Sequence, residues 1–341
     1  MVLAVKVQLK DAQEVKRFLI DNALFNPDYG FKKDNSSIFF PISKKGSIKK
    51  RFSMVEFVDA ELDKLDKKKN LRATLEQKLS ADELTVLRRA FDTIGNIAII
   101  DIPPEVEKNE KLIAETLLKL QKNVKTVLKK GGIHETEFRT QPMVHLAGVN
   151  TKETIHKEHG VMLKLDVEKV YFSPRLSTER LRVSSQVKPG ESILVMFSGC
   201  APYPCVIAKN AKPIEIVGVE LNPIGHKYGL ENLKLNKIGN VTLINGDVKD
   251  IVPKLNKKFD RIVMPLPKSA GDFLDSAFSA AKKNTIIHFY AFEEEGRFYV
   301  AEKRILDACK KNKLKCKIIR TVKCGQHAPR TFRICVDFKI I

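Results

Sequence analysis

The sequence predicts an α/β fold, in which a doubly wound sheet of seven strands follows two smaller α+β modules. Three observations favour this fold class. Apolar runs at 192–197 and 214–219 bracket a tight turn and a short helix, which is the pattern of a βαβ unit. Strand and helix patterns alternate beyond it. The last two strands are joined only by the short loop 323–330, which indicates an antiparallel hairpin.

Residues 1–66 form the first small module. Residues 2–8 alternate as a half-buried strand, and 12–22 carry apolar residues at helical spacing. We expect two further strands, at 37–41 and 53–58. The lysine-rich run 63–69 then indicates a linker, whose lysines either form a solvated hinge or touch phosphate.

Residues 67–168 form the second small module. A capping box, Ser80 followed by Glu83, predicts a helix over 80–94. The other expected elements are a helix at 109–128 and strands at 96–102, 135–139, 154–156 and 161–166. The stretch 133–180 has few apolar residues and many Arg, Glu and His, which is typical of a segment that faces a ligand or solvent.

Residues 169–341 form the large module. The expected strands lie at 192–197, 214–219, 241–245, 261–264, 285–292, 315–322 and 332–338, and the helices between them at 223–236, 248–254, 268–282 and 298–312. A doubly wound sheet that is closed by an antiparallel hairpin is the Rossmann-like architecture of class I methyltransferases. The sheet of an ordinary dehydrogenase is not expected to end in such a hairpin.

The first βαβ unit has the features of a nucleoside site. Glycine at Gly199 lets the turn approach a ligand, and Glu220, about 20 residues later, can accept both hydroxyls of a ribose. The turn lacks G-x-G-x-x-G, and no GK[ST] loop is present, so a pyrophosphate fits poorly. S-adenosylmethionine, which has a ribose and an adenine but no phosphate, fits better. A purely structural βαβ crossover would give the same pattern.

Other polar residues follow the neighbouring strands, and the carboxyl ends of parallel strands meet at one edge of the sheet. The expected ring is Ser198-Gly199, Glu220, Asn245-Gly246-Asp247 and Pro265-Leu266-Pro267. In this ring Glu220 would take the ribose hydroxyls and Asp247 the adenine amino group. Both acids could instead be helix N-caps.

Composition favours a polyanionic partner. The chain has 61 Lys+Arg against 41 Asp+Glu, a formal charge of +20, although a generally lysine-rich surface would give the same surplus. Nothing resembles a signal peptide or a membrane span, so we expect a cytoplasmic protein. The six cysteines show no zinc spacing and are expected to be reduced. His134, His145, His156 and His159 lack metal-site spacing, and we expect no metal.

The most specific motif is Y-F-S-P-R-L-S-T-E-R at 171–180, a loop that leads into a short helix. Arg175 and Glu179 are four residues apart in it, which is also the spacing of a common surface ion pair. Further motifs accompany it: Phe138-Arg139, H-L-A-G at 145–148, T-I-H-K-E at 154–158, M-F-x-G at 196–199, E-L-N-P at 220–223 and L-P-K at 266–268.

With these motifs the chain resembles the archaeal and eukaryotic tRNA methyltransferases that methylate N1 of guanosine 37. The resemblance is dense from about residue 137 to the end, and over 1–130 it is one of layout only. It implies S-adenosylmethionine as cofactor, tRNA as partner, and a monomer. It also implies that the two N-terminal modules grip the tRNA, the first at the elbow, while the catalytic part takes the anticodon stem-loop.

The resemblance assigns roles residue by residue. It makes Glu179 the general base, Arg139 the cation that steadies the guanine, and Arg175 a member of the same active-site loop. The implied substrate-binding residues are Tyr171, Arg180, Pro265 and Pro267. The implied cofactor-binding residues are Phe197, Gly199, Glu220, Asn222 and Asp247.

These roles agree with the chemistry of the guanine base. N1 carries a proton at neutral pH, so its methylation needs a base to remove that proton and a cation to balance the charge that develops on O6. A carboxylate and a guanidinium supply both, once the nucleotide is pulled out of the anticodon loop.

Two residues depart from the family pattern. Val195 stands where family members commonly have Asp, which would remove a cofactor-side hydrogen bond, and Pro265 stands where they commonly have Asn near the guanine. Two alternatives therefore stay open. One is a methyltransferase for C7 of the wyosine precursor at position 37 or for another RNA nucleotide, and the other is a non-catalytic RNA-binding protein.

Overall fold

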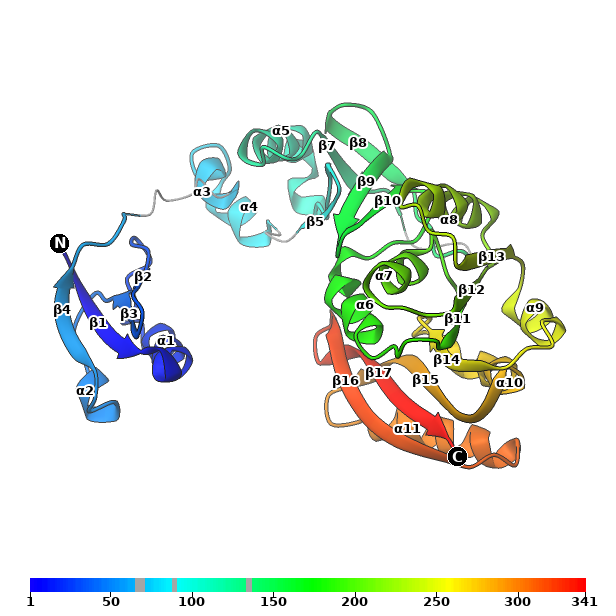
Figure 1. Cartoon of the computed structure of the whole chain (residues 1–341). Helices are drawn as coiled ribbons and strands as arrows, with labels where there is room; N and C mark the ends of the chain where they lie inside the picture. Colours follow the sequence, from blue (N-terminus) through cyan, green and yellow to red (C-terminus); the bar gives the residue numbers. More distant parts are fainter. Residues whose placement is uncertain (65–70, 88–90, 133–136) are drawn as a thin grey trace. The chain divides into compact units, whose positions relative to one another are not determined.

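The structure is a computed structural model that describes residues 1–64, 71–87, 91–132 and 137–341. The chain forms two compact units, Met1–Lys78 and Leu79–Ile341, which are considered separately (Figure 1). Several sequence-based expectations lie outside the described residues: most of the linker at 63–69, part of the helix at 80–94, the start of the strand at 135–139, and His134. Within the described residues, every helix is too short or too polar to span a bilayer.

The small unit is an antiparallel sheet with one helix packed on it. Its strands are β1 (Val2–Gln8), β2 (Lys32–Lys33), β3 (Ser37–Pro41) and β4 (Glu56–Ala60), in the order β2-β3-β1-β4. Its helices are α1 (Ala12–Asp21), α2 (Ile48–Arg51) and α3 (Leu71–Leu75). Val15 and Leu19 of α1 are buried against Val5 and Phe40 of the sheet, which is why the apolar residues of α1 recur at helical spacing. The strand expected at 53–58 lies two to three residues later.

The large unit begins with a mixed sheet and a hairpin. The sheet contains β5 (Phe91–Ile94), β6 (Ile97–Ile100), β7 (Thr126–Lys130) and β8 (Met143–Gly148), in that order, and the hairpin contains β9 (Glu153–Glu158) and β10 (Val161–Asp166). The helices are α4 (Ala81–Val86) and α5 (Glu110–Leu120). The predicted capping box is present at α4, because Ser80 and Glu83 each accept the other's backbone N–H.

Several boundaries predicted for this part were wrong. The helix expected over 80–94 ends at Val86, and 91–94 are strand β5; the helix expected over 109–128 ends at Leu120, and its last residues belong to strand β7. Residues 137–139 form a turn rather than a strand, and β8 was not predicted. Thr126, Val127 and Leu128 are fully buried between β6 and β8, so sheet pairing decides their structure.

The main sheet has the order β13-β12-β11-β14-β15-β17-β16, in which β17 runs antiparallel to both neighbours. Its strands are β11 (Ser192–Met196), β12 (Glu215–Glu220), β13 (Val241–Asn245), β14 (Phe259–Met264), β15 (Ala281–Glu294), β16 (Cys316–Ala328) and β17 (Thr331–Ile340). The predicted seven-stranded, hairpin-closed sheet is confirmed. The order places the ends of β11, β12 and β14 next to one another.

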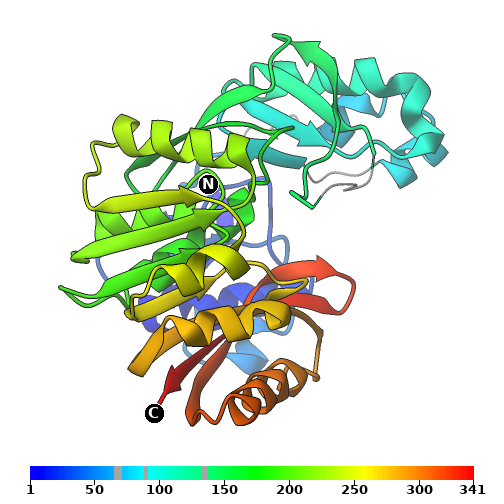
Figure 2. The same ribbon diagram turned by 90° about the vertical axis from the view of Figure 1, so that its right-hand side faces the viewer.

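Helices cover both faces of this sheet (Figures 1 and 2). They are α6 (Ser177–Ser184), α7 (Pro202–Asn210), α8 (Pro223–Leu235), α9 (Val248–Lys254), α10 (Leu274–Ser279) and α11 (Tyr299–Lys311). Leu194 and Met196 of β11 pack with α9, α10 and α11, whereas Ile193 and Val195 pack with α6 and α7. Because helices cover both faces of the sheet, these strands are continuous apolar runs in the sequence. The helix expected over 268–282 was too long, since β15 begins at Ala281.

Charged groups are buried at one side of the main sheet. Arg261 of β14 is fully buried and donates to both carboxylate oxygens of Glu191, at 2.8 and 3.0 Å, and to the carbonyl of Gln186. Its Nη1 also lies 2.8 Å from Nε2 of His288. Arginine can only donate, so Nε2 accepts and the ring proton sits on Nδ1, which donates to Asp337 at 2.6 Å.

We predict that Arg261→Met lowers the free energy of unfolding of the large unit by about 3–5 kcal/mol, because it leaves the Glu191 carboxylate without its partner. Urea denaturation of the full chain measures this change. The control is Arg297→Met, which removes an exposed ion pair to Glu294 and is expected to change stability by less than about 0.5 kcal/mol. Equal effects of the two substitutions would contradict the structural importance of the buried pair.

Candidate active site

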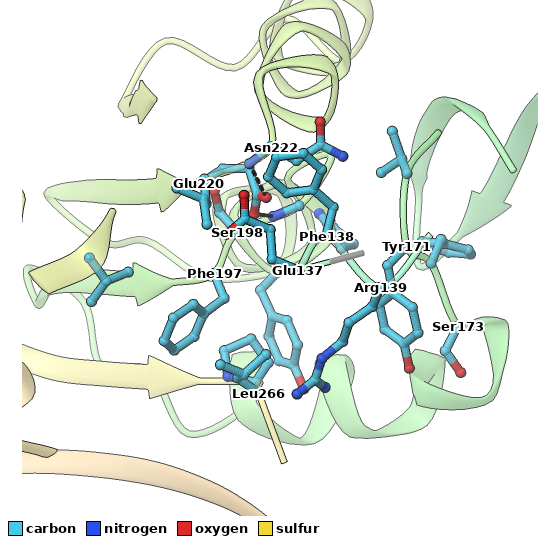
Figure 3. A pocket seen from close by; sticks show the side chains of 18 of the residues that line it. Glu137, Phe138, Arg139, Tyr171, Ser173, Phe197, Ser198, Glu220, Asn222 and Leu266 are labelled. Atoms are coloured by element: carbon cyan, nitrogen blue, oxygen red, sulfur yellow. Dashed lines mark hydrogen bonds between the residues drawn. The ribbon is translucent and has the colours of Figure 1, made fainter. Parts of the chain in front are cut away.

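A cavity of about 410 Å³ opens at the carboxyl ends of β11, β12 and β14 (Figure 3). Three stretches that are distant in the sequence line it: residues 137–139, the segment 170–173, and the turns that follow the strands. Of the residues singled out from the sequence, the structure brings into its wall Arg139, Tyr171, Arg180, Phe197, Gly199, Glu220, Asn222, Asp247 and Pro265.

The turn after β11 is strained and tied to the next strand. Phe197 (φ 60°) and Ala201 (φ 64°) occupy the left-handed region, which is unfavourable for residues other than glycine, and Gly199 (φ 57°) lies between them. The N–H of Gly199 donates to Oε2 of Glu220 at 2.6 Å. The side chain at the tip of β12 therefore fixes the shape of the turn.

Glu220 is held from both sides. Its Oε1 accepts the N–H of Asn222 at 2.9 Å, while Oε2 accepts that of Gly199. Burial raises the pKa of this carboxyl, and the two backbone hydrogen bonds oppose that rise. The result is a carboxylate at the rim of the cavity whose orientation is set by the protein itself.

The N-cap alternative was raised for Glu220 and Asp247; it holds for Asp247, whereas the N-cap of α8 is Asn222 and not Glu220. Asn222 caps α8, since its Oδ1 accepts the N–H of Ile224 at 2.9 Å, and Asp247 caps α9 by accepting the N–H of Lys249 at 2.7 Å. Both residues line the cavity as well. Capping orients these side chains at the cavity wall, so the two alternatives weighed for Asp247 are compatible.

Arg180 is a buried ion-pair residue. Its Nε and Nη2 donate to the two oxygens of Glu158, at 2.5 and 2.6 Å, and its guanidinium also donates to the carbonyl of Ser173. The guanidinium lies 5.0 Å from the ring centroid of Phe172. Its contacts therefore hold the segment 171–173 against the cavity.

Arg139 is a cation without an acidic partner among the described residues. It has φ 57°, and Figure 3 shows its side chain extending toward Leu266. Burial lowers the pKa of its guanidinium, and the neighbouring Arg333 adds to this effect. A half-buried, uncompensated guanidinium favours a ligand that carries or develops negative charge.

Glu179 lies behind the cavity wall instead of lining the cavity. It is 5% exposed, and Arg182 donates to both of its oxygens at 2.7 Å. The Tyr290 hydroxyl donates to Oε1 at 2.5 Å, and Tyr290 in turn accepts from Tyr203, a cavity residue, at 2.9 Å. The sequence reasoning missed these three residues, although Arg182 stands at the i+3 position from Glu179.

The surface ion pair considered for Arg175 and Glu179 does not form. Arg175 instead donates to both oxygens of Asp92, at 2.7 and 3.1 Å. Pro267 is buried and lines neither this cavity nor the hollow described next.

A second, larger hollow of about 1020 Å³ shares Arg139 and Tyr171 with the cavity. Its lining combines cations and aromatic rings, namely Lys130, Arg139, Arg175, Lys268, Arg333, Tyr171, Phe172, Phe292 and His327. Phe292 and His327 are stacked with their centroids 3.9 Å apart and their planes 21° apart. Aromatic platforms among cations are typical of sites that bind single-stranded nucleic acid.

Three of the histidines that were considered as a metal cluster are hydrogen-bonded. His145 contacts the carbonyl of Gly148, His156 the carboxylate of Glu158, and His159 the side chain of Ser177. Among the described residues, the trio that is close enough to share a metal ion is His288, Cys335 and Asp337. Arg182, Arg261 and Arg320 already contact this trio, which disfavours a further cation.

Models of three protein families match the chain. The TRM5/TYW2 methyltransferase domain matches residues 154–319, the TYW2 N-terminal domain residues 71–151, and the tRNA methyltransferase 5 N-terminal domain residues 4–48.

Two of the relatives match over the whole chain, and a third matches over part of it. The tRNA (guanine(37)-N(1))-methyltransferase Trm5b of Pyrococcus abyssi is 39% identical over 341 residues, which is 100% of this chain and 99% of the relative. The Trm5b of Methanocaldococcus jannaschii is 33% identical, with 100% and 99% covered. A tRNA 4-demethylwyosine(37)-methyltransferase, Taw21 of Saccharolobus solfataricus, is 35% identical, and the match covers 63% of this chain and 82% of the relative.

Solved structures match in the same way. The crystal structure of Trm5b from P. abyssi has a TM-score of 0.74 at 39% identity and covers 100% of this chain and 99% of its own. A complex of aTrm5 with tRNALeu has a TM-score of 0.71 at 30% identity, with 99% and 100% covered. M. jannaschii TYW2 in complex with AdoMet has a TM-score of 0.58 at 27% identity, with 74% and 99% covered.

We predict that Glu158 makes stability depend on acid pH. Burial alone would raise its pKa, but hydrogen bonds from His156 and Arg180 lower it to about 2. Its folded-state pKa lies below the unfolded value near 4.5, so its stabilising contribution is complete above about pH 4.5 and is lost as the pH falls toward 2.

Acid-unfolding curves of the wild type and of Glu158→Gln measure this contribution. The variant is expected to be less stable at neutral pH, with a shallower loss of stability between pH 4.5 and 2. Parallel curves for the two proteins in that range would show that Glu158 titrates normally.

Proposed function

The chain belongs to the TRM5/TYW2 family of methyltransferases, and from that premise we propose that it is the enzyme that transfers a methyl group from S-adenosylmethionine to N1 of guanosine 37 in tRNA. The observation that carries the proposal is the guanidinium of Arg139, which has no acidic partner among the described residues, in a cavity whose rim holds a fixed carboxylate, Glu220. The full-length likeness to two guanine-37 N1-methyltransferases supports it.

The donor set of the cavity fits S-adenosylmethionine. Glu220 and Asp247 offer carboxylate oxygens to hydroxyl and amino groups, and the apolar walls of Phe197, Leu221 and Phe273 suit the adenine ring. We assign Phe197, Gly199, Glu220, Asn222 and Asp247 to this cofactor. When bound, it supplies a sulfonium methyl group that is already activated for transfer. The Glu220 side chain is already held in place before the cofactor binds, so binding costs less conformational entropy.

In this proposal Arg139 and Glu179 have complementary roles. Arg139, whose own charge no described carboxylate neutralises, balances the negative charge that develops on O6 as N1 loses its proton. Glu179 is the acceptor of the N1 proton, and Arg182 keeps it oriented. Tyr171, whose hydroxyl accepts from Arg333 at 3.1 Å, borders both hollows and would contact the extruded base.

The second hollow is the proposed path of the anticodon loop. Lys130, Lys268 and Arg333 would contact phosphates, and the stacked Phe292 and His327 would receive an unstacked base. Residues 67–168 supply part of this lining, and we propose that residues 1–66 contact the elbow of the tRNA. The proposal includes action as a monomer in the cytoplasm.

Pro265 supports a second candidate activity, methylation of the wyosine precursor. It lines the cavity without a side-chain donor or acceptor, so base selection there depends on shape more than on hydrogen bonds. Val195 carries no such argument, because it is fully buried among Ile193, Tyr203 and Tyr290 and does not line the cavity. Val195 therefore belongs to the core of the sheet.

We predict that the protein transfers label from S-adenosylmethionine to unmodified tRNA with guanosine at position 37 and not to the same tRNA with adenosine there, because adenosine has an amino group in place of the O6 whose developing charge Arg139 would balance. Nuclease digestion and chromatography identify the product as 1-methylguanosine. A parallel reaction with tRNA that carries the tricyclic precursor tests the second activity. Label on both unmodified tRNAs, or on neither, would contradict the proposal.

Glu179→Gln is predicted to lower the single-turnover rate of methylation by about 10²–10⁴-fold with little change in tRNA affinity, since the amide keeps the shape but cannot accept the proton. Rapid quench with saturating cofactor measures the rate, and filter binding measures the affinity. Glu294→Gln, an exposed residue, is the matched control. An unchanged rate in Glu179→Gln would remove this residue as the base.

Glu220→Gln is predicted to weaken the binding of S-adenosylmethionine by about tenfold or more, because it removes a charged acceptor for the ribose and loosens the turn at Gly199. Isothermal titration calorimetry without tRNA measures the Kd for S-adenosylmethionine. Affinity for tRNA should stay at the wild-type value, and a variant that binds the cofactor normally would argue against Glu220 as a cofactor residue.

A further inference from the structure

Two tyrosines lie between the proposed base and the cavity. Glu179 is 5% exposed and is absent from the linings of both hollows, whereas Tyr203 lines the cavity. A carboxylate that takes a proton from a bound base must reach it directly or through a group that can pass the proton on. The geometry of the site offers the second route.

Two phenol groups connect Glu179 to the cavity. The Tyr203 hydroxyl donates to the Tyr290 oxygen at 2.9 Å, and the Tyr290 hydroxyl donates to Oε1 of Glu179 at 2.5 Å. Both rings are almost completely buried, with 3% and 1% of their surface exposed. No described residue donates a hydrogen bond to the Tyr203 oxygen, so this oxygen keeps an open acceptor position. Tyr203 is the member of the chain that lines the cavity.

The other contacts of Glu179 make this route specific. Arg182 donates to both of its oxygens but is always charged and cannot relay a proton. The Cys324 thiol also lies against Glu179, but burial raises its pKa far above neutrality and it is a weak donor. Burial also raises the pKa of Tyr203 and of Tyr290, which keeps both phenols neutral between turnovers.

We propose that Tyr203 is a catalytic residue that takes the N1 proton of the target guanine and passes it through Tyr290 to Glu179. This step rests on the proposed function. As the N1–H bond breaks, its electron pair forms the new N1–CH₃ bond, and the pair of the breaking S–CH₃ bond stays on sulfur. The N1 proton moves to the Tyr203 oxygen, the Tyr203 proton to the Tyr290 oxygen, and the Tyr290 proton to Oε1 of Glu179, which becomes a neutral acid.

The relay is tested with Tyr203→Phe and Tyr290→Phe in the full-length protein. Phenylalanine keeps the ring but removes the hydroxyl, so each variant interrupts the chain with little change in packing. The matched control is Tyr228→Phe, which also removes a phenol that donates to a glutamate, Glu153, but lines neither hollow. Cys324→Ala tests the alternative path through the thiol.

Single-turnover methylation of guanosine-37 tRNA is measured in H₂O and D₂O, with separate measurements of cofactor and tRNA affinity. The relay predicts that both relay variants lose at least tenfold in rate with affinities within twofold of wild type. It also predicts that more than one proton in motion contributes to the solvent isotope effect on the wild-type rate. The size of this isotope effect should change in the relay variants. Tyr228→Phe should keep the wild-type rate, and Cys324→Ala should lose less rate than either relay variant.

Several results would overturn the relay. Wild-type rates in Tyr203→Phe while Glu179→Gln is inactive would mean that Glu179 reaches the base directly. A loss confined to Cys324→Ala would give the role to the thiol. A loss of rate in Tyr203→Phe that matches a loss of cofactor affinity would reduce Tyr203 to a binding role. A wild-type protein that methylates no guanosine-37 tRNA would refute the proposed function and the relay together.

Discussion

The guanidinium of Arg182 joins the parts on which the candidate site depends. It donates to both oxygens of Glu179 on its own helix, α6, and at 2.6 and 3.2 Å to both oxygens of Asp337 on β17. Charges buried in this way are tolerable only when they are paired and hydrogen-bonded. The pairing therefore fixes α6 against the antiparallel strand of the sheet. Because the segment 171–176 runs directly into α6, one wall of the cavity is fixed as well.

The charge network continues into the sheet. Burial alone would raise the pKa of Asp337, but hydrogen bonds from His288, Arg182 and Arg320 hold it well below its usual range. His288 is kept neutral, since burial lowers its pKa and Arg261 donates to its Nε2. The result is a set of polar side chains with few free orientations. A carboxylate held in such a set keeps its position when substrate binds, which is the preorganisation that catalysis requires.

The two hollows differ in their charged residues, although Glu137 lines both and Asp92 lines the larger one. The carboxylates of Glu220 and Asp247 lie in the cavity assigned to the cofactor, whereas Lys130, Lys268 and Arg333 line the larger hollow. Arg139 lies where the two meet, without an acidic partner among the described residues. The arrangement suits a cationic methyl donor at one end and a polyanion at the other, with the reacting base between them.

The sequence by itself determined the seven-stranded sheet, its hairpin and most residues of the cavity. Buried parallel strands leave apolar runs, and ligand residues follow directly at their ends, so both signals are local in the chain. The sequence did not determine the sheet that contains β7 and β8. Residues 126–128 fit a helical pattern locally, but the pairing of β7 with β6 and with β8 makes them a strand.

Only the tertiary structure decided how Glu179 is used. No local pattern shows that Arg175 pairs with Asp92, or that residues 203 and 290 connect Glu179 to the cavity. These partners come from different strands and helices and meet through side chains that are 83 to 111 positions apart in the sequence. Such contacts form only when the packed layers bring their elements together, which is the physical reason the sequence could not show which side chains surround Glu179.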